Sequence, residues 1–291
     1  MAEIVHLNGH LVPRSEAKLS PFDHGFLYGY GLFETMRAYN GHIFRLDRHL
    51  TRLRCSAESL GLAGKLTAFD LKAACLETLK ANKLKEARLR LTITAGEGDM
   101  IPDPGTCSSL TVLVAAKNLI PLPPKKYELG FKGTLSSIRR NSLSPLSRLK
   151  STCYLDSILA RMEAKAARAD EAIMLNEQGY LAEGSISNIF LVCQRMLVTP
   201  SLGSGALPGI TREAVLEIAQ TFNIKAEERE VELKELTQAE EAFITNSVLE
   251  IMPLTWFDGK PIGTGKPGQL TKNLMTAYKK LVNKTLGEIS P

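Results

Sequence analysis

Three prolines in the segment NLIPLPPKK, Pro121, Pro123 and Pro124, limit more than any other feature how this chain can fold. Proline lacks a backbone donor and disfavours helix at the preceding residue, so this stretch is predicted to be a stiff connection. We expect a first domain over residues 1–117, a linker over 118–126 and a second domain over 127–291. The 291 residues are 44% hydrophobic, which suffices for two cores.

The first half has the signature of an antiparallel sheet with helices. Asn8-Gly9 and Asn40-Gly41 each lie between apolar runs, and this dipeptide accepts the positive φ values of a tight hairpin. Apolar residues at helical spacing from Leu46 predict a helix that ends near Gly61, and a second helix should follow Thr67. ARLRLTITAG and SSLTVLVAAK are predicted to be strands.

The second half is also predicted to be mixed. Strands are expected at YELGFKG, EAIMLN, SNIFLV, AFITN and PLTWFD, with helices over Tyr154 to Arg168 and over TREAVLEIAQTF. Both domains therefore belong to the α+β class.

Composition excludes several classes of function. The net charge of +5 is mild and spread along the chain, which argues against a nucleic-acid partner. With neither a leader pattern nor an apolar run long enough to span a bilayer, we expect a cytoplasmic protein without a membrane partner. The five cysteines have no CxxC spacing, and neither GxSxG nor HExxH occurs, so disulfides, a metal site and hydrolase chemistry are not predicted.

Lys150 in SRLKST and Glu183 in GYLAEGSISNIF are the candidate chemical pair. A lysine amine can capture a carbonyl as a Schiff base, and a carboxylate beside a pyridinium nitrogen keeps that ring electron-withdrawing, which together indicate pyridoxal-phosphate chemistry. The alternatives stay open. Lys150 taken alone fits a solvated surface lysine, and Glu183 taken alone fits an exposed turn carboxylate.

A phosphate site is indicated by LPGITR, where a Pro-Gly turn precedes a predicted helix whose first N–H groups suit an anion. Thr211 in this segment fits equally well as the cap of its own helix. TNS at 245–247 adds hydroxyls at a strand end. Arg52 offers a fixed charge, or else is a solvated helix arginine.

In order and spacing, these segments resemble the fold-type IV, or class IV, pyridoxal-phosphate family of branched-chain aminotransferases, D-amino-acid aminotransferases and 4-amino-4-deoxychorismate lyases. The resemblance covers almost the whole chain, through SPFDHGFLYGYGLFETMRAYNG, RLDRHLTRL, RLKSTCYLDSILARMEA, DEAIMLNEQGYLAEGSISNIF, LPGITREAV and TNSVLEIMPLTWFDGKPIG. It implies a small N-terminal α/β sandwich, a larger barrel-like C-terminal domain, the cofactor pyridoxal 5'-phosphate, a small-molecule substrate and a homodimer.

Position by position, the resemblance implies that Lys150 is the Schiff-base lysine and that Glu183 pairs with the pyridine nitrogen. It also implies a tyrosine near the cofactor's phenolic oxygen, at Tyr154. The residues implied to hold the phosphate are Arg52, Ile210, Thr211 and Ser247.

Within this resemblance, FDHGFLYGYGLFETMRAYNG, RLTITAGEG and TNSVLEIMP look more like the lyases than like the aminotransferases. The resemblance therefore implies a lyase that converts 4-amino-4-deoxychorismate to 4-aminobenzoate and pyruvate. The position of the substrate-carboxylate arginine of D-amino-acid aminotransferases is Ala95 here. The alternative is an aminotransferase acting on branched-chain or D-amino acids with 2-oxoglutarate or pyruvate. The candidate substrate residues, each of which also fits a structural or solvated role, are Phe33, Thr35, Arg37, Arg139 and Arg140.

Overall fold

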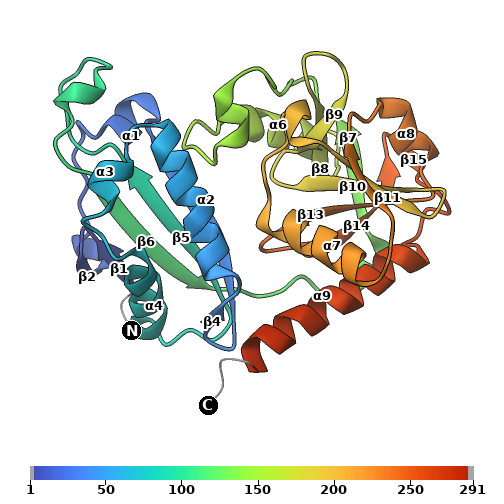
Figure 1. Ribbon diagram of the computed structural model, residues 1–291, viewed down its shortest axis with the longest axis horizontal. Coiled ribbons are helices and arrows are strands. Elements are labelled where there is room, and N and C mark those ends of the chain that lie inside the picture. The colour runs from blue at the N-terminus through green and yellow to red at the C-terminus, as the bar shows by residue number, and fades with distance from the viewer. Residues whose placement is uncertain (1–2, 288–291) are drawn as a thin grey trace. The chain divides into compact units, whose positions relative to one another are not determined.

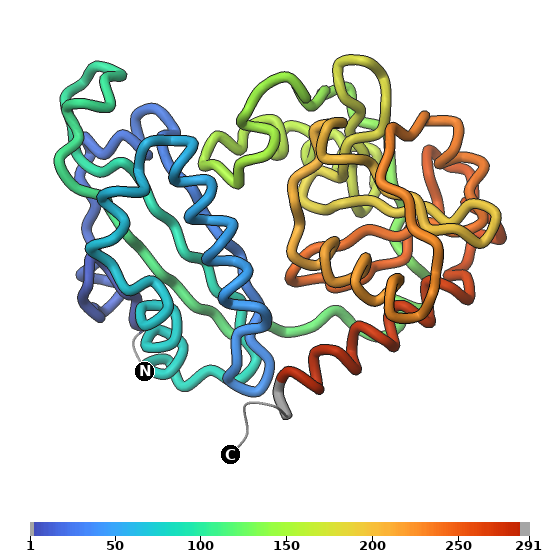
Figure 2. The backbone as a smooth tube through the Cα atoms, viewed as in Figure 1, coloured from blue at the N-terminus to red at the C-terminus, as the bar shows by residue number. Residues whose placement is uncertain are grey.

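The computed structural model describes residues 3–287 of the 291-residue chain, and the backbone divides into two compact units (Figure 1). The first unit runs to Ile120 and also includes Leu149–Cys153. The second comprises Pro121–Arg148 and the chain from Tyr154 onward. Figure 2 shows the course of the backbone through both units. The change of unit at Ile120 falls within the proline-rich segment, whereas the place of Leu149–Cys153 in the first unit was not expected. The outer ends of the two predicted domains, residues 1–2 and 288–291, lie outside the described residues.

The first unit is built on an antiparallel six-stranded sheet in the order β2-β1-β6-β5-β3-β4. Its strands are β1 (Ile4–Leu7), β2 (His10–Pro13), β3 (Gly31–Tyr39), β4 (His42–Ile43), β5 (Ala87–Thr94) and β6 (Thr111–Asn118). Both Asn-Gly turns have positive φ, 48° and 94° at Asn8-Gly9 and 47° and 83° at Asn40-Gly41. The hairpin predictions are confirmed, because these are the angles that such turns require.

Helices cover one face of this sheet (Figure 1). They are α1 (His24–Tyr28), α2 (Leu46–Ser59), α3 (Ala63–Leu66) and α4 (Leu71–Ala81). β5 shows how the sequence divides the two faces, because Leu89 and Leu91 are fully buried in the core whereas Arg88 and Arg90 are exposed. The opposite face of β5 is therefore polar and basic.

The second unit contains a nine-stranded mixed sheet in the order β12-β11-β10-β13-β14-β7-β8-β9, with β15 paired to β14. Its strands are β7 (Phe131–Leu135), β8 (Glu171–Leu175), β9 (Leu181–Gly184), β10 (Asn188–Cys193), β11 (Met196–Pro200), β12 (Ala226–Arg229), β13 (Glu241–Asn246), β14 (Glu250–Phe257) and β15 (Lys260–Pro261). β9 lies at one end of this order but also contacts β10 and β11. The sheet therefore curls into a half-barrel, in agreement with the predicted fold class.

The helices of the second unit are α5 (Pro124–Leu129), α6 (Leu155–Ala166), α7 (Ile210–Thr221), α8 (Leu233–Gln238) and α9 (Gln269–Gly287). α7 packs against α9 and β13. On β10 and β13 the rings of Phe190 and Phe243 stack with centroids 5.0 Å apart. The start of α7 lies close to the first residue of β10, because a Cβ atom on Gly209 would overlap Asn188.

One element differs from the sequence-based expectation. The segment YELGFKG was predicted to be a strand, but its first residues belong to α5, and the strand begins only at Phe131. Pro124 is the first residue of α5, a position where its missing N–H is not needed and its fixed φ suits the helix. The proline-rich segment therefore ends in the first turn of α5.

Among residues 3–287, no helix is long and apolar enough to cross a bilayer. In the same range there is no cluster of three or more histidine, cysteine or acidic side chains that could bind a metal ion. All five cysteines are free thiols.

Candidate active site

Lys150 lies along β3 in the first unit. Its carbonyl accepts a 2.8 Å hydrogen bond from the N–H of Phe33, and the next residues continue the pairing, with the N–H of Thr152 donating to the carbonyl of Gly31 at 2.9 Å. The Nζ atom lies 4.7 Å from the centroid of the Phe33 ring. This cation–π contact and its half-buried side chain distinguish Lys150 from a freely solvated surface lysine.

Phe33 also contacts Arg90, whose guanidinium carbon lies 3.8 Å from the ring centroid. Alternation along β3 places Phe33, Thr35 and Arg37 on the same side of the sheet, away from the helices. Arg90 is the cross-strand partner of Thr35, and Arg37 stacks on Tyr39 at 4.4 Å. Arg90 was not among the candidates taken from the sequence. The alternation of ARLRLTIT places it on the exposed face of β5, but its contact with Phe33 depends on how β5 pairs with β3.

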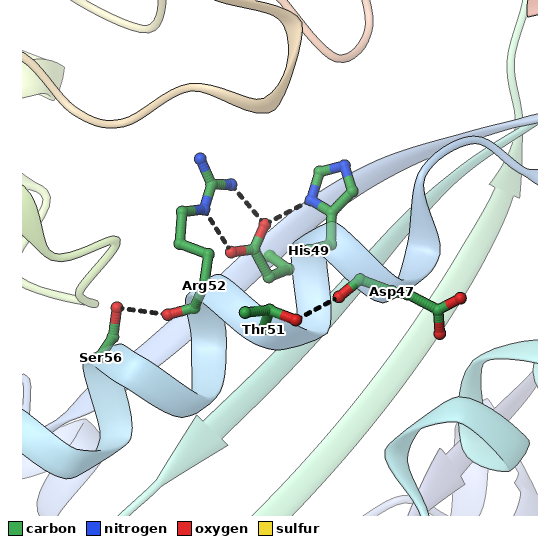
Figure 3. A network of polar contacts seen from close by, with 6 residues as sticks. Asp47, His49, Thr51, Arg52 and Ser56 are labelled. Atoms are coloured by element: carbon green, nitrogen blue, oxygen red, sulfur yellow. Dashed lines mark hydrogen bonds and ion pairs between the residues drawn. The ribbon is translucent and has the colours of Figure 1, made fainter. Parts of the chain in front are cut away.

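Arg52 belongs to a buried network on the helix-covered side of the same sheet. Its Nε and Nη2 donate to the two carboxylate oxygens of Glu34 at 2.8 and 2.6 Å, and His49 Nδ1 lies 2.7 Å from Oε2. Arg52 and His49 both extend from α2 towards this one carboxylate (Figure 3). The Arg52 side chain is only 10% exposed, so it is not a solvated helix arginine.

The buried charges of this network shift the pKa values of Glu34 and His49. Burial alone would raise the pKa of Glu34, but Arg52 and His49 outweigh it and lower that pKa to about 2. Burial lowers the pKa of His49, with Arg52 and Lys150 acting in the same direction against the attraction of Glu34. An ionised Glu34 only accepts hydrogen bonds, so a neutral His49 donates through Nδ1 and fixes the carboxylate that orients Arg52.

Glu183 lies in β9 of the second unit and is only 8% exposed, which excludes an exposed turn carboxylate. Its Oε1 lies 3.2 Å from Arg140 Nη2. Oε2 accepts the backbone N–H of Leu207 at 2.9 Å and the Nδ2 group of Asn188 at 3.4 Å. The carboxylate is therefore held from two sides by donors.

The turn after Glu183 is held by a second buried carboxylate. Glu171 accepts the hydroxyl of Ser187 at 2.8 Å and also the hydroxyl of Ser185. The turn closes so tightly that a Cβ atom on Gly184 would overlap Ser187 Oγ. Glycine is required here by close approach, and the turn directs Asn188 back towards Glu183.

The start of α7 lies over the same region. Its N-cap is Gly209, with no side-chain cap, so Thr211 does not cap its own helix. A Cβ on Gly209 would overlap Asn188 Oδ1, which shows how close the helix start comes to β10. Thr245 is the cross-strand partner of Asn188, and its buried Oγ1 has no hydrogen-bond partner among residues 3–287. Uncapped N–H groups and an unsatisfied buried hydroxyl are features that suit a bound anion.

The remaining candidates have different surroundings. Tyr154 immediately precedes α6, and burial raises its pKa, with the negative charge of Glu183 adding to the shift. Ser247 follows β13 in a turn where Asn246 Oδ1 accepts the N–H groups of Val248 and Leu249 at 2.9 and 2.8 Å. Arg139 is exposed.

The first unit thus contains Lys150, Phe33, Thr35, Arg37 and Arg52, and the second contains Tyr154, Glu183, Ile210, Thr211, Ser247, Arg139 and Arg140. Within the second unit, Glu183 and the start of α7 are linked through Asn188 and Leu207.

The class IV amino-transferase family model matches residues 31–256, which include Lys150, Glu183 and the start of α7. This chain belongs to the class IV aminotransferases. It is 40% identical over 281 residues to a putative branched-chain-amino-acid aminotransferase of Methanocaldococcus jannaschii, with 96% of each chain covered. It is 38% identical to the aminodeoxychorismate lyase of Bacillus subtilis, covering 98% of this chain and 97% of that protein.

Among solved structures, this class IV enzyme is similar to a branched-chain amino acid aminotransferase of T.th. with pyridoxamine 5'-phosphate. The TM-score is 0.89 at 31% identity, and the match covers 96% of this chain and 94% of that one. The family and its solved members identify the protein as a pyridoxal-phosphate-dependent enzyme. The uncapped α7 start and the unsatisfied Thr245 hydroxyl fit the phosphate of that cofactor.

Proposed function

We propose that the protein is a lyase that converts 4-amino-4-deoxychorismate to 4-aminobenzoate and pyruvate. The observation that carries this proposal is the basic face of β3 and β5 beside Lys150. Arg37 and Arg88 are cross-strand partners there, and Arg90 stacks on the ring that also contacts Lys150 Nζ. Several guanidinium groups on one face suit a substrate with two carboxylates. The lyase of Bacillus subtilis is a relative over nearly the full length.

In this proposal each candidate residue supplies a different part of the chemistry. Bound pyridoxal phosphate provides a ring that withdraws electrons from the amine-bearing carbon. Lys150 takes the proton from that carbon, and Glu183 keeps the ring nitrogen protonated. Arg52, Ser247 and the N–H groups of Ile210 and Thr211 would hold the phosphate, and Tyr154 would contact the phenolic oxygen.

The lyase then differs from a transaminase in the bond that breaks. Loss of the proton from the amine-bearing carbon is followed by cleavage of the C–O bond of the neighbouring enol ether. The enol takes up a proton and leaves as pyruvate, and the remaining ring becomes aromatic. No keto-acid acceptor is consumed.

A second function, transamination of branched-chain or D-amino acids with 2-oxoglutarate or pyruvate, is favoured by the relative from Methanocaldococcus jannaschii at 40% identity. The roles of Lys150 and Glu183 would be the same, because both reactions begin with removal of the same proton. Lys150 would then return the proton to the cofactor, and a keto acid would collect the amine.

Product analysis of the holoenzyme separates the two functions. Incubation with 4-amino-4-deoxychorismate in the absence of any keto acid should release equal amounts of 4-aminobenzoate and pyruvate, and Lys150→Ala should release neither. Rapid turnover of leucine or D-alanine with 2-oxoglutarate, without aromatic product from the chorismate derivative, would favour the transaminase instead.

We further propose that the protein is a cytoplasmic homodimer that associates through α6. Apolar side chains at helical spacing are exposed there, namely Leu155 (64%), Ile158 (51%), Leu159 (38%) and Met162 (62%). A row of exposed apolar side chains on one helix face is typical of a surface that is covered in an assembly. Ile158→Glu combined with Met162→Glu should lower the mass measured by light scattering from that of a dimer to that of one chain. An unchanged mass would exclude this face as the interface.

A further inference from the structure

The geometry points to Arg140 as a positioning residue, which holds Glu183 ionised and thereby keeps the proton on the cofactor's ring nitrogen. This inference rests on the proposed pairing of Glu183 with that nitrogen. From the sequence, Arg140 was a candidate contact for a substrate carboxylate, and a structural or solvated role was the alternative. In the structure its Nη2 atom lies 3.2 Å from Glu183 Oε1, and both side chains are largely buried, at 16% and 11% exposure.

Arg140 is itself held firmly at both ends. Its backbone N–H donates to the carbonyl of Leu175 at 2.9 Å, which places the residue beside the end of β8. Its guanidinium donates through Nη2 to the carbonyl of Ser147 at 2.9 Å and through Nε to that of Gly205 at 3.4 Å. Two backbone carbonyls therefore orient the planar group that contacts Glu183, so little conformational freedom remains to be lost when a ligand binds.

The contact between Arg140 and Glu183 affects the position of the proton that Glu183 would share with the cofactor's ring nitrogen. A proton between a carboxylate and a pyridine nitrogen can lie on either group. A cation beside the carboxylate stabilises the state in which the carboxylate is negative and the ring is positive, because the negative charge is the nearer of the two. Limited exposure of both side chains weakens solvent screening of this effect. Arg140 therefore favours the pyridinium form, which is the better electron sink.

The same network reaches the proposed phosphate site. Leu207 donates its N–H to Glu183 Oε2 at 2.9 Å, while its carbonyl accepts Asn188 Nδ2 at 2.9 Å. Arg140 contacts Gly205, at the other end of the short loop that leads to the Gly209 cap of α7. The residues around Glu183 thus fix the loop that positions the start of α7. The same loop therefore orients both the proposed partner of the ring nitrogen and the proposed phosphate site.

The test measures the protonation state directly, by the ¹⁵N chemical shift of the cofactor's ring nitrogen in holoenzyme reconstituted with ¹⁵N-labelled pyridoxal phosphate. The wild type should show the shift of a pyridinium. Arg140→Gln should move it towards that of neutral pyridine, and Arg140→Lys, which keeps the charge, should remain closer to the wild type. Arg148→Gln, an exposed arginine in the same segment, serves as the matched control and should leave the shift unchanged.

Kinetics distinguish positioning from substrate binding. For Arg140→Gln we expect kcat to fall roughly tenfold with little change in KM, since a weaker electron sink raises the barrier of the chemical step. A rise in KM with the wild-type ¹⁵N shift would show that Arg140 binds substrate, and it would overturn the inference. Arg140→Met, which keeps the apolar stem, replaces Arg140→Gln if the latter does not fold.

The ¹⁵N shifts also distinguish the role of Arg140 from the proposed pairing of Glu183 with the ring nitrogen. If Glu183→Gln leaves the ¹⁵N shift at the wild-type value, Glu183 is not the partner of the ring nitrogen and the proposed function fails at that point. If Glu183→Gln changes the shift but Arg140→Gln and Arg140→Met do not, only the role of Arg140 is contradicted.

Discussion

Each unit of this enzyme buries a glutamate against an arginine, but the two pairs are built differently. In the first unit, Glu34 is completely buried and meets Arg52 through two parallel hydrogen bonds, with His49 as a third donor. In the second, Glu183 is 8% exposed and meets Arg140 through one contact, together with an amide and a backbone N–H. The first pair is a fork-to-fork salt bridge of the strongest kind.

The difference indicates a division of labour. The hydrogen bonds from Arg52 and His49 compensate the charge of Glu34, and Glu34 in turn holds Arg52 in place. Removal of the Glu34 carboxylate should therefore lower mainly the free energy of unfolding. Glu183 is 8% exposed and accepts from donors on several residues, which suits a carboxylate that pairs with a ligand, so its loss should be felt mainly in turnover. Substitutions that convert each glutamate to glutamine test this contrast.

Glu34→Gln should give the largest loss of stability. The substitution leaves Arg52 buried without its counter-charge, and breaking a buried ion pair in this way costs about 3 kcal/mol. Thermal or urea unfolding of the variant measures the loss. Glu58→Gln, an exposed glutamate on α2, is the matched control and should unfold like the wild type. A stability loss no greater than that of the control would show that the pair contributes little.

Acid should weaken the first unit through the same group. Folding lowers the pKa of Glu34 from 4.5 to about 2, so the ionised form is the one that the fold stabilises. The contribution is fully present above the unfolded pKa and is lost as pH falls from 4.5 towards about 2. That pKa difference corresponds to about 3 kcal/mol. Unfolding measured across this pH range should therefore be steeper for the wild type than for Glu34→Gln, and parallel curves would contradict the assignment.

Glu183→Gln should mainly reduce turnover. Glutamine cannot stabilise a pyridinium proton as a carboxylate does, so we expect kcat to fall about a hundredfold while the melting temperature changes little. Glu230→Gln, an exposed glutamate of the same unit, should keep wild-type kinetics. A variant that loses stability but retains turnover would reverse the roles that we assign to the two glutamates.

Thr245→Val should have the smallest effect, which should be confined to the affinity for the cofactor. The Oγ1 atom of Thr245 is buried without a partner among residues 3–287, so its removal should leave the unfolding temperature of the cofactor-free protein unchanged or slightly higher. If that hydroxyl donates to the cofactor's phosphate, affinity for the cofactor should fall by a few-fold, up to about tenfold. Titration of the cofactor-free protein measures this, and equal affinities would remove Thr245 from the site.

Local features of the fold were predictable from sequence because they depend on neighbouring residues. Both Asn-Gly hairpins and the strand alternation of ARLRLTIT follow from backbone angles and from period-two burial. The α5 helix was not predicted, because prolines were taken only as breakers although one of them starts the helix. The pairing of Leu149–Cys153 with β3 joins residues far apart in the sequence, and no local pattern encodes it.

The candidate site was predictable in part for the same reason. Glu183 and Lys150 were selected as candidates from their motifs, whereas the residues that surround them lie elsewhere in the chain. Arg140 and Glu183 are brought together by β8 and β9, and Glu34 meets Arg52 only because α2 packs on β3. Arg90 was missed because its contact with Phe33 forms only when β5 pairs with the neighbouring strand β3.

Covalent trapping shows whether Lys150 carries the cofactor, as we propose. Holoenzyme treated with borohydride, digested and mapped by mass spectrometry should carry the reduced cofactor on Lys150, and Lys150→Ala should give no such label. A label on another lysine, or none in wild-type protein that contains the cofactor, would contradict the account.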